Sequence, residues 1–217
     1  MTSTTPSRET RFERAVRLCT MLARGDVAPI AQGLWLRWHG LEHPFGLFVA
    51  AEAGHHHEHS GGMRLSAVLG TLAIPRGSVV IDFGVGTGIA ALTLSRHFTR
   101  VIGIELAPDL LAAARRNADR MRVRNIDLHC ADVREVTGIL DSVTHIYMFN
   151  PFGEAIMRDV MANLVASVDR APRALTLVYK APEWCAPIEA AGFVLKRSWR
   201  FPGGDAYAVY ERPTPRG

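Results

Sequence analysis

From residue 62 onwards, two kinds of apolar spacing follow one another along the chain. Short runs in which nearly every residue is apolar predict strands buried on both faces, and stretches with apolar residues three and four positions apart predict helices. Strand and helix in repeated turn are typical of a parallel sheet with helices on both faces. The strands are expected at residues 78–83, 100–106, 126–132, 144–150 and 174–180, and the helices at 63–74, 88–98, 108–121, 154–170 and 182–192.

The end of the chain departs from this alternation. Residues 193–201 and 205–212 each alternate apolar and polar side chains, and the turn between them is Pro-Gly-Gly. This combination predicts a β-hairpin. We therefore expect an α/β fold with a doubly wound, mostly parallel sheet that ends in an antiparallel pair.

The N-terminal part of the chain has a different pattern. Before Gly25, apolar residues such as Phe12 and Val16 recur at helical spacing, which predicts an amphipathic helix. The stretch after it is rich in aromatic residues and histidine and is interrupted by glycine and proline, so short helical pieces and loops are expected there. Within one domain, we divide the chain into an N-terminal helical cap on the substrate side, residues 1–61, and a core, residues 62–217.

Composition narrows the class of protein. At 217 residues and 23.8 kDa, the chain is long enough for one domain with a full core. No apolar run reaches the roughly 20 residues that a membrane span requires, and the N-terminus lacks the apolar core of a signal peptide, so we expect a cytoplasmic protein with no membrane partner. The three cysteines are scattered, as in proteins of a reducing compartment.

The charge of the chain is mild. The net charge is +4, and the arginines between 115 and 124 are expected to be solvated charge at a helix end. The alternative is that they attract an acidic substrate or nucleic acid. We do not expect nucleic acid as a partner.

The first predicted strand runs into a loop with glycine at every second position, at Gly84, Gly86 and Gly88. In a doubly wound sheet the ligand lies beyond the carboxyl ends of the strands, and glycines in this loop let it approach the backbone amides. The dinucleotide fingerprint would require Gly or Ala where Ile89 stands, which argues against an NAD-dependent oxidoreductase. Asp82 precedes the loop, and its carboxylate suits a ligand with an ammonium group better than a phosphate.

Acidic residues follow the next two predicted strands. Glu105 closes the second strand, about twenty residues beyond the first glycine, as an acid that accepts hydrogen bonds from both ribose hydroxyls would. Asp132 follows the third strand, where it can accept from the amine of an adenine, or else cap the helix that comes after it. A ligand with an ammonium group, a ribose and an adenine but no phosphate is S-adenosylmethionine.

Residues 62–212 resemble the class I S-adenosylmethionine-dependent methyltransferases in the order of their motifs: VIDFGVGTG, VIGIEL, CADV, FNPFG and the closing hairpin. The resemblance implies an enzyme, S-adenosylmethionine as its cofactor, and seven strands in the order 3-2-1-4-5-7-6 with strand 7 antiparallel. It also implies that Asp82 and the glycine loop hold the methionine end, that Glu105 binds the ribose, and that residues 131–133 border the adenine. The implied cofactor-binding residues are Asp82, Gly84, Val85, Gly86, Thr87, Gly88, Glu105, Leu106, Ala131, Asp132, Val133 and Asn150.

The motif after the fourth predicted strand bears on the substrate. Methyltransferases that act on nitrogen often carry Asn-Pro-Pro-Tyr or Asn-Pro-Pro-Phe here. This chain matches at Asn150 and Pro151, lacks the second proline, and has Phe152 one place early. The resemblance implies in-line methyl transfer to a nitrogen of a protein or small-molecule amine. We expect these three residues to be catalytic, with Asn150 orienting the acceptor and Phe152 covering the methyl group.

Other interpretations stay open. They are an O-methyltransferase of a small molecule, a regulatory protein that binds S-adenosylmethionine without catalysis, and an aminopropyl transferase, although no acidic polyamine site is evident near FNPFG. The acceptor molecule stays open, as does the oligomeric state. Trp35 and Trp38 are expected to pack onto the sheet, with stacking on a planar substrate as the alternative.

A run of histidines also calls for an interpretation. His55 and His59 could share one face of a helix and bind a metal ion, but a third ligand at recognisable spacing is missing. We expect no metal site, and we interpret the run as a polar loop of the substrate cap.

Overall fold

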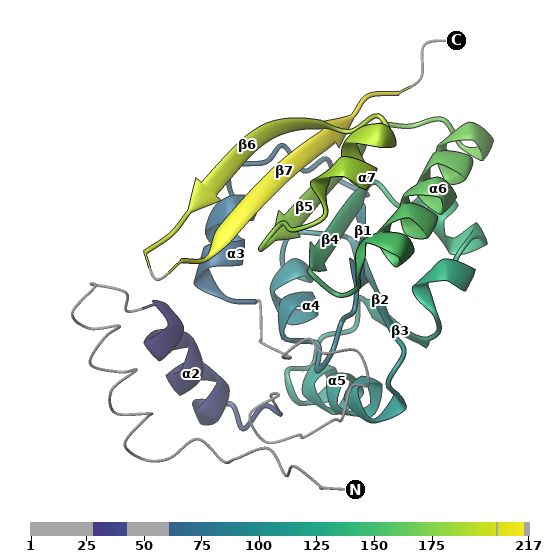
Figure 1. Cartoon of the computed structure of the whole chain (residues 1–217). Coiled ribbons are helices and arrows are strands. Elements are labelled where there is room, and N and C mark those ends of the chain that lie inside the picture. Colours follow the sequence, from purple (N-terminus) through teal and green to yellow (C-terminus); the bar gives the residue numbers. More distant parts are fainter. Residues whose placement is uncertain (1–27, 43–60, 203, 215–217) are drawn as a thin grey trace, which may run out of the picture.

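The structure, a computed structural model, describes residues 28–42, 61–202 and 204–214. Within these ranges a seven-stranded sheet carries helices on both faces (Figure 1). The strand order is β3-β2-β1-β4-β5-β7-β6; β1 to β5 are parallel, and β7 is antiparallel to both β5 and β6. The predicted fold class and strand order are confirmed. The strands are β1 Val79–Phe83, β2 Arg100–Glu105, β3 Ile126–Cys130, β4 His145–Phe149, β5 Leu175–Lys180, β6 Val194–Arg200 and β7 Ala206–Arg212.

The helices form a layer on each side of the sheet. On one face lie α3, α4 and α5, and on the other lie α6, α7 and η2. The helix predicted over residues 63–74 ends at Leu69, because the N–H groups of Thr71 and Leu72 bond to carbonyls three residues earlier and close the last turn. The helices are α2 Ala28–Trp38, α3 Met63–Leu69, α4 Ile89–Leu94, α5 Pro108–Arg120, α6 Glu154–Arg170 and α7 Cys185–Ala190, with 3-10 helices η1 Val133–Glu135 and η2 Gly138–Ser142.

The central strands are buried on both faces. On β1, Val80 packs in the cluster that contains α3 and α4, whereas the next residue, Ile81, packs in the cluster that contains α6. Burial of each such side chain stabilises the fold by about 1.5–3 kcal/mol. Both faces need apolar residues, which is why the strands appear in the sequence as continuous apolar runs.

The helix α2 packs against α4. Leu36 is buried in a cluster with Ile89 and Leu92 of α4, and Trp35 packs against the same cluster. Trp38, by contrast, is 87% exposed. The prediction that both tryptophans pack onto the sheet is therefore wrong for Trp38, which lies on the side of α2 away from α4, and Trp35 packs against α4 instead.

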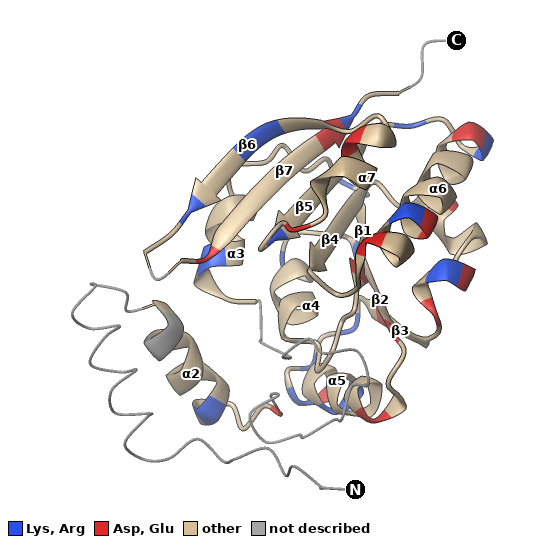
Figure 2. Ribbon diagram, in the orientation of Figure 1, with Lys and Arg blue, Asp and Glu red and all other residues tan. Residues whose placement is uncertain are grey.

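The arginines of α5 are exposed, as predicted, and two of them also tie α5 to the segment after α2. Arg116 makes two hydrogen bonds to the carboxylate of Glu42, and Arg120 donates to the carbonyl oxygen of Gly40 at 2.7 Å. Acidic residues lie among the basic ones on α5 (Figure 2). These guanidinium groups therefore stabilise the fold, and they do not form a surface patch that carries positive charge alone.

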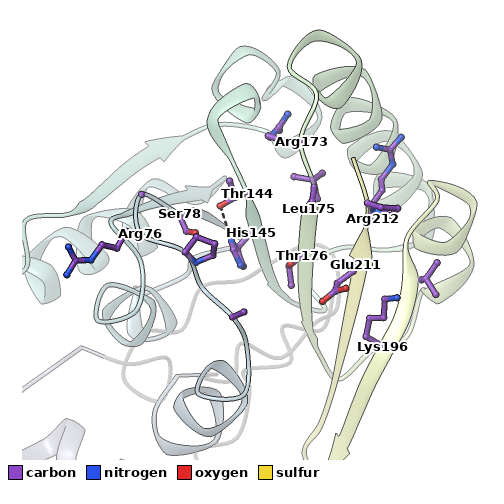
Figure 3. A pocket seen from close by; sticks show the side chains of 16 residues that line it. Arg76, Ser78, Thr144, His145, Arg173, Leu175, Thr176, Lys196, Glu211 and Arg212 are labelled. Carbon is purple, nitrogen blue, oxygen red and sulfur yellow. Dashed lines mark hydrogen bonds between the residues drawn. The ribbon is translucent and has the colours of Figure 1, made fainter. Parts of the chain in front are cut away.

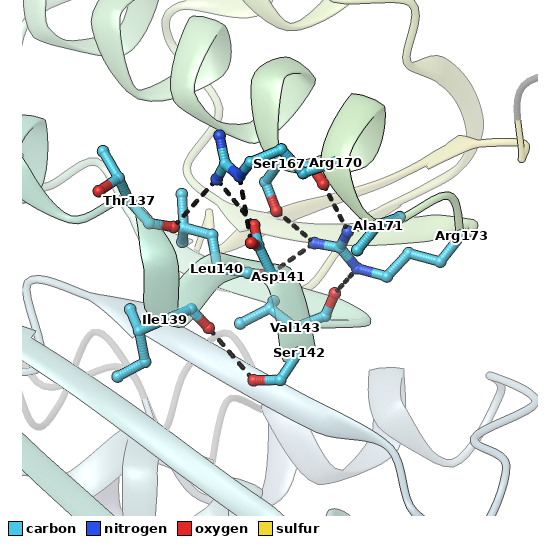
Figure 4. A network of polar contacts seen from close by, with 10 residues as sticks. All are labelled: Thr137, Ile139, Leu140, Asp141, Ser142, Val143, Ser167, Arg170, Ala171 and Arg173. Atoms are coloured by element: carbon cyan, nitrogen blue, oxygen red, sulfur yellow. Dashed lines mark hydrogen bonds and ion pairs between the residues drawn. The ribbon is translucent and has the colours of Figure 1, made fainter.

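A further arginine joins three elements at the amino ends of β4 and β5. Arg173 donates to the carbonyl oxygens of Leu140 and Ala171 at 2.6 and 2.7 Å, to the hydroxyl of Ser167 at 2.9 Å, and to the carbonyl of Val143 (Figure 4). One guanidinium thus fixes η2 and the last turns of α6 to the start of β5.

Two predictions about the N-terminal part fall outside the described residues. The amphipathic helix expected before Gly25 is one, and the run from His55 to His59 is the other. The division into a cap, 1–61, and a core, 62–217, therefore stays a prediction. Among the residues that the structure places, no helix has the length and apolar character of a membrane span.

Candidate functional site

The glycine loop after β1 is held in a left-handed backbone conformation. Gly84, Gly86 and Gly88 have φ angles of 76°, 54° and 80°. The N–H groups of Gly84 and Val85 both donate to the carbonyl oxygen of Ile104, at 2.9 and 3.0 Å, which folds the loop over the end of β2. A residue with a side chain is strained at such φ angles, so the alternating glycines are a requirement of the loop itself.

The three glycines differ in what a side chain would meet. A Cβ atom on Gly84 would lie 2.7 Å from Cβ of Pro151, and one on Gly88 would lie 3.1 Å from Cβ of Ala114 in α5. A Cβ atom on Gly86 would meet nothing within 4 Å. Gly84 and Gly88 therefore allow close packing, against the Asn-Pro motif and against α5, while Gly86 leaves room for a ligand to approach the backbone.

The carboxylate of Glu105 is fixed at this loop by two backbone amides. It is 8% exposed, and it accepts from the N–H of Gly86 at 2.9 Å and from the N–H of Ala107 at 3.0 Å. Each oxygen keeps further acceptor capacity after these bonds. The structure thus brings Glu105 to the glycine loop, as predicted from the spacing.

Asp82 lies at the end of β1, before the same loop, and its surroundings are unusual. The residue is 2% exposed, and its Oδ2 atom has no hydrogen-bond partner among the residues that the structure describes. Burial raises the pKa of this carboxyl to about 8, with a further contribution from nearby Glu105. A buried carboxyl oxygen without a donor, beside the open space at Gly86, fits a ligand that brings an ammonium group.

Asp132 has a structural partner. Its carboxylate accepts from the backbone N–H of Arg134 at 2.9 Å, which caps η1, and it forms an ion pair with the guanidinium of the same residue. The hydrogen bond from the Arg134 side chain, with its positive charge, holds the pKa of Asp132 below its ordinary value. The capping role that the sequence left open is therefore present, and the adenine-binding role of Ala131, Asp132 and Val133 stays a prediction.

Asn150 directly follows β4 and has a left-handed backbone, with a φ of 40°. Its Oδ1 atom accepts from the hydroxyl of Tyr179 at 2.9 Å, and its Nδ2 atom donates to the carboxylate of Glu183. Tyr179 is buried on β5, and Glu183 is exposed in the loop that follows β5. Both partners were missed in the sequence, where they stand 29 and 33 residues from Asn150; polar residues at the end of a predicted strand were the available signal.

The two residues after Asn150 have different positions. Pro151 touches the glycine loop beside Gly84. Phe152 is 6% exposed and packs in the main core, with its ring centroid 6.4 Å from that of Phe83 at an interplanar angle of 67°. The structure gives Phe152 a packing role, and its role in covering the methyl group stays a prediction.

A buried amide in α5 links the glycine loop to the N-terminal part of the chain. Asn117 is 1% exposed, and its Nδ2 atom donates to the carbonyl oxygens of Thr87 and Glu42 at 2.9 and 2.8 Å. Its Oδ1 atom accepts from the N–H of Glu42 at 2.8 Å. Of the other predicted cofactor residues, Val85 and Thr87 are buried in the loop, and Leu106 is 68% exposed next to Glu105.

Two other features do not overlap with this site. Among the described residues, no group of three or more metal-ligating side chains comes together. A cavity of about 620 Å³ lies at the amino ends of β1, β4 and β5, lined by Arg76, Arg173 and Lys196 among others (Figure 3). The glycine loop is at the carboxyl ends of these strands, so this cavity is at the opposite edge of the sheet, and it contains none of the predicted site residues.

Comparison with known proteins shows that part of the core is similar to a known family. Residues 80–173 match the family model described as a methyltransferase domain. An RNA methyltransferase from Salinibacter ruber, solved in complex with S-adenosyl-L-homocysteine, has the same fold: the TM-score is 0.52 at 19% identity, over 71% of this chain and 90% of that one.

Curated relatives match over shorter stretches. A tRNA (uracil-5-)-methyltransferase homolog A from Homo sapiens is 39% identical over 66 residues, 30% of this chain and 11% of that protein. The 23S rRNA (uracil(1939)-C(5))-methyltransferase RlmD from Shewanella amazonensis is 27% identical over 126 residues, 57% of this chain and 28% of that protein. Protein-L-isoaspartate O-methyltransferase 2 from Marinobacter nauticus is 42% identical over 53 residues, 24% of each chain. The chain thus spans less than a third of the full length of each of these relatives.

Proposed function

We propose that the protein transfers a methyl group from S-adenosylmethionine to a nitrogen atom. Residues 80–173 match a methyltransferase domain, and the sheet has the strand order of the class I, S-adenosylmethionine-dependent family. The observation that carries the choice of nitrogen is the position of Asn150. Its amide lies at the carboxyl end of β4, held by Tyr179 and Glu183, and the following Pro151 touches the glycine loop. An amide oxygen at this point can accept a hydrogen bond from an N–H group of the substrate. The nitrogen lone pair of the substrate is then directed at the methyl group.

The residues present fit the cofactor. The open space at Gly86 leaves the backbone accessible, Glu105 keeps acceptor capacity for ribose hydroxyls, and the unpartnered oxygen of Asp82 suits the ammonium of the methionine part. The exposed side chain of Leu106, next to Glu105, offers apolar surface to a ring. When bound, S-adenosylmethionine supplies a methyl group on a positively charged sulfur.

The chain's own contribution to the reaction is positioning. In-line displacement requires the acceptor nitrogen, the methyl carbon and the sulfur to be aligned, and holding them so accounts for much of the rate. Asn150 is prepared for this task, because both ends of its amide are already bonded to protein groups and it loses little freedom on binding.

Methylation of RNA is the second candidate. Two curated relatives are named for the methylation of uracil in tRNA and in 23S rRNA. The expectation that nucleic acid is not a partner therefore has no support from the comparisons. The isoaspartate relative is named as an O-methyltransferase, so the family matches do not select one acceptor atom.

Two measurements test the proposal. Calorimetry with S-adenosylmethionine, S-adenosylhomocysteine and NAD should show micromolar binding of the first two, lost in Glu105→Ala. Labelled methyl groups should then be transferred to amines and not to total RNA, and Asn150→Ala should lower kcat by at least about tenfold. RNA labelled at a carbon or oxygen atom, or an unchanged rate in Asn150→Ala, would show that the choice of a nitrogen acceptor held by Asn150 is wrong.

A further inference from the structure

We propose that the acceptor is a primary aliphatic amine, and that Asn150 and Glu183 bind its two N–H groups. This inference rests on the proposed transfer of a methyl group to nitrogen. It goes further by naming the class of amine and by assigning a substrate-binding role to Glu183.

The two partners of Asn150 fix the orientation of its side-chain amide. A carboxylate accepts hydrogen bonds and cannot donate them, so the atom of Asn150 that faces Glu183 must be Nδ2. Oδ1 then faces the hydroxyl of Tyr179, which donates to it at 2.9 Å. A carbonyl oxygen has two lone pairs, so one of them stays available for a substrate N–H.

The backbone around these residues is strained. Within the described part of the chain, Arg122, Asn150 and Ala181 are the non-glycine residues with positive φ. Asn150 and Ala181, at 40° and 48°, directly follow Phe149 and Lys180, which are register partners at the ends of β4 and β5. Strained residues that persist in a fold tend to lie at functional sites. One strained residue, Asn150, is itself a partner in the hydrogen bond to Glu183, and the other, Ala181, lies two residues before Glu183.

The carboxylate of Glu183 brings a negative charge next to Asn150. Among the described residues, no lysine or arginine forms an ion pair with Glu183. Lys180 is the last residue of β5, three positions before Glu183. Its Nζ atom lies 4.0 Å from the centre of the Phe149 ring and 3.5 Å from Oδ1 of Asp205. Lys180 and Tyr179 are consecutive strand residues, so their side chains lie on opposite faces of the sheet. An exposed carboxylate beside Asn150 therefore attracts cations and repels the phosphates of RNA.

The number of hydrogen-bond acceptors bears on the class of amine. A neutral primary amine has two N–H groups and one lone pair. With one N–H on Oδ1 of Asn150 and the other on the carboxylate of Glu183, the lone pair is left for the methyl group. A hydroxyl has one hydrogen, and a secondary amine has one N–H, so neither satisfies both acceptors. The arrangement thus selects a primary amine and favours a single methylation.

The reaction balances without a further reagent. The acceptor arrives as R–NH3+ and loses one proton to water. The nitrogen lone pair forms the new N–C bond while the C–S bond breaks, and the electron pair of that bond stays on sulfur. The products are the monomethylammonium ion of the acceptor and S-adenosylhomocysteine.

The test uses the full chain and S-adenosylmethionine with a labelled methyl group. The acceptors are hexylamine, N-methylhexylamine, hexanol, poly-L-lysine and total tRNA. We expect transfer to hexylamine or poly-L-lysine, and these two arms distinguish a free amine from a lysine side chain. The product should carry one methyl group, and N-methylhexylamine should react at least about tenfold more slowly than hexylamine.

Glu183→Gln isolates the role of the carboxylate. It should raise KM for the amine at least about tenfold, with S-adenosylmethionine affinity and the thermal unfolding midpoint unchanged. Glu189→Gln, an exposed residue on α7, is the matched control and should behave as the wild type. An unchanged KM in Glu183→Gln, or equal rates for primary and secondary amines, would overturn this inference alone. Transfer to no amine despite cofactor binding would overturn the proposed function with it.

Discussion

Asp82 and Glu105 differ in what the fold offers their oxygen atoms. Both carboxyls are buried at neighbouring strand ends, but Glu105 accepts from two backbone amides, whereas Oδ2 of Asp82 has no donor among the described residues. A buried carboxyl without a partner favours its protonated form, and its pKa rises to about 8. A cation placed beside it would favour the ionised form instead. We therefore expect Asp82 to make cofactor binding depend on pH.

We expect S-adenosylmethionine binding to release about one proton at pH 7, because the ligand's ammonium lowers the pKa of Asp82 from about 8. Affinity should therefore rise with pH, by at most about tenfold per unit, and become level above pH 8. Calorimetry in buffers of different ionisation enthalpy measures the released protons. Asp82→Asn should bind without proton release, and a wild-type protein that releases no proton would contradict the assignment.

At the scale of secondary-structure elements, α5 couples the glycine loop to the segment after α2. Asn117 reaches Thr87 on one side and Glu42 on the other through three hydrogen bonds of 2.8–2.9 Å. The loop is left-handed at three glycines and has no regular structure of its own. Its conformation therefore depends on neighbours such as α5, and a change in the buried face of α5 should reach the cofactor.

Asn117→Ala should lower both stability and cofactor affinity. It removes three hydrogen bonds, of which the one to Thr87 is buried, and it leaves their partners unsatisfied, which costs on the order of 1–3 kcal/mol per buried group left without a partner. We expect weaker S-adenosylmethionine binding by about tenfold or more, measured by calorimetry, with a lower unfolding midpoint. Asn125→Ala is the control, because it loses hydrogen bonds to Ser95 and Phe98. It should be destabilised with unchanged affinity; equal losses of affinity in both variants would rule out a specific role for Asn117.

At the scale of the whole molecule, the edge of the sheet opposite the glycine loop contains a buried histidine that bears on acid stability. His145, at the start of β4, is 5% exposed, lies edge-on to Phe98 with ring centroids 4.9 Å apart, and bonds to the hydroxyl of Thr144 at 2.9 Å. Burial lowers the pKa of this imidazole to about 4. The neutral ring is thus part of the folded structure, while the unfolded chain takes up a proton near the ordinary value of about 6.5.

The sign of the pH dependence follows from this difference. Below about pH 6.5 the unfolded state binds one more proton than the folded state, so stability falls as pH drops from 6.5 towards about 4. The slope from this one group is at most about 1.4 kcal/mol per pH unit. Urea unfolding between pH 4.5 and 8 should show that His145→Gln loses part of the slope, while His129→Gln, exposed on β3, keeps it. Equal slopes in all three proteins would contradict a neutral buried His145.

The amino-acid sequence by itself determined the architecture and the positions of the glycine loop and Glu105. Apolar runs and helical spacing are short-range properties, and they predict the strands and the closing hairpin; the strand order follows from the resemblance to class I methyltransferases. The loop of Gly84, Gly86 and Gly88, and Glu105 after the next strand, were found for the same reason. Each follows a predicted strand, and parallel strands bring their carboxyl ends to one edge.

Only the tertiary structure decided which side chains touch. Asn150 meets Tyr179 and Glu183, and Asn117 meets Glu42 at a separation of 75 residues. Such contacts depend on strand register and on how helices dock, which no local pattern encodes. The same holds for burial: Phe152, expected at the methyl group, lies in the core, whereas Trp38, expected to pack onto the sheet, lies on the surface. The periodicity of apolar residues determines which face of a helix or strand is buried. The packing of one element on another determines which residues that face contacts.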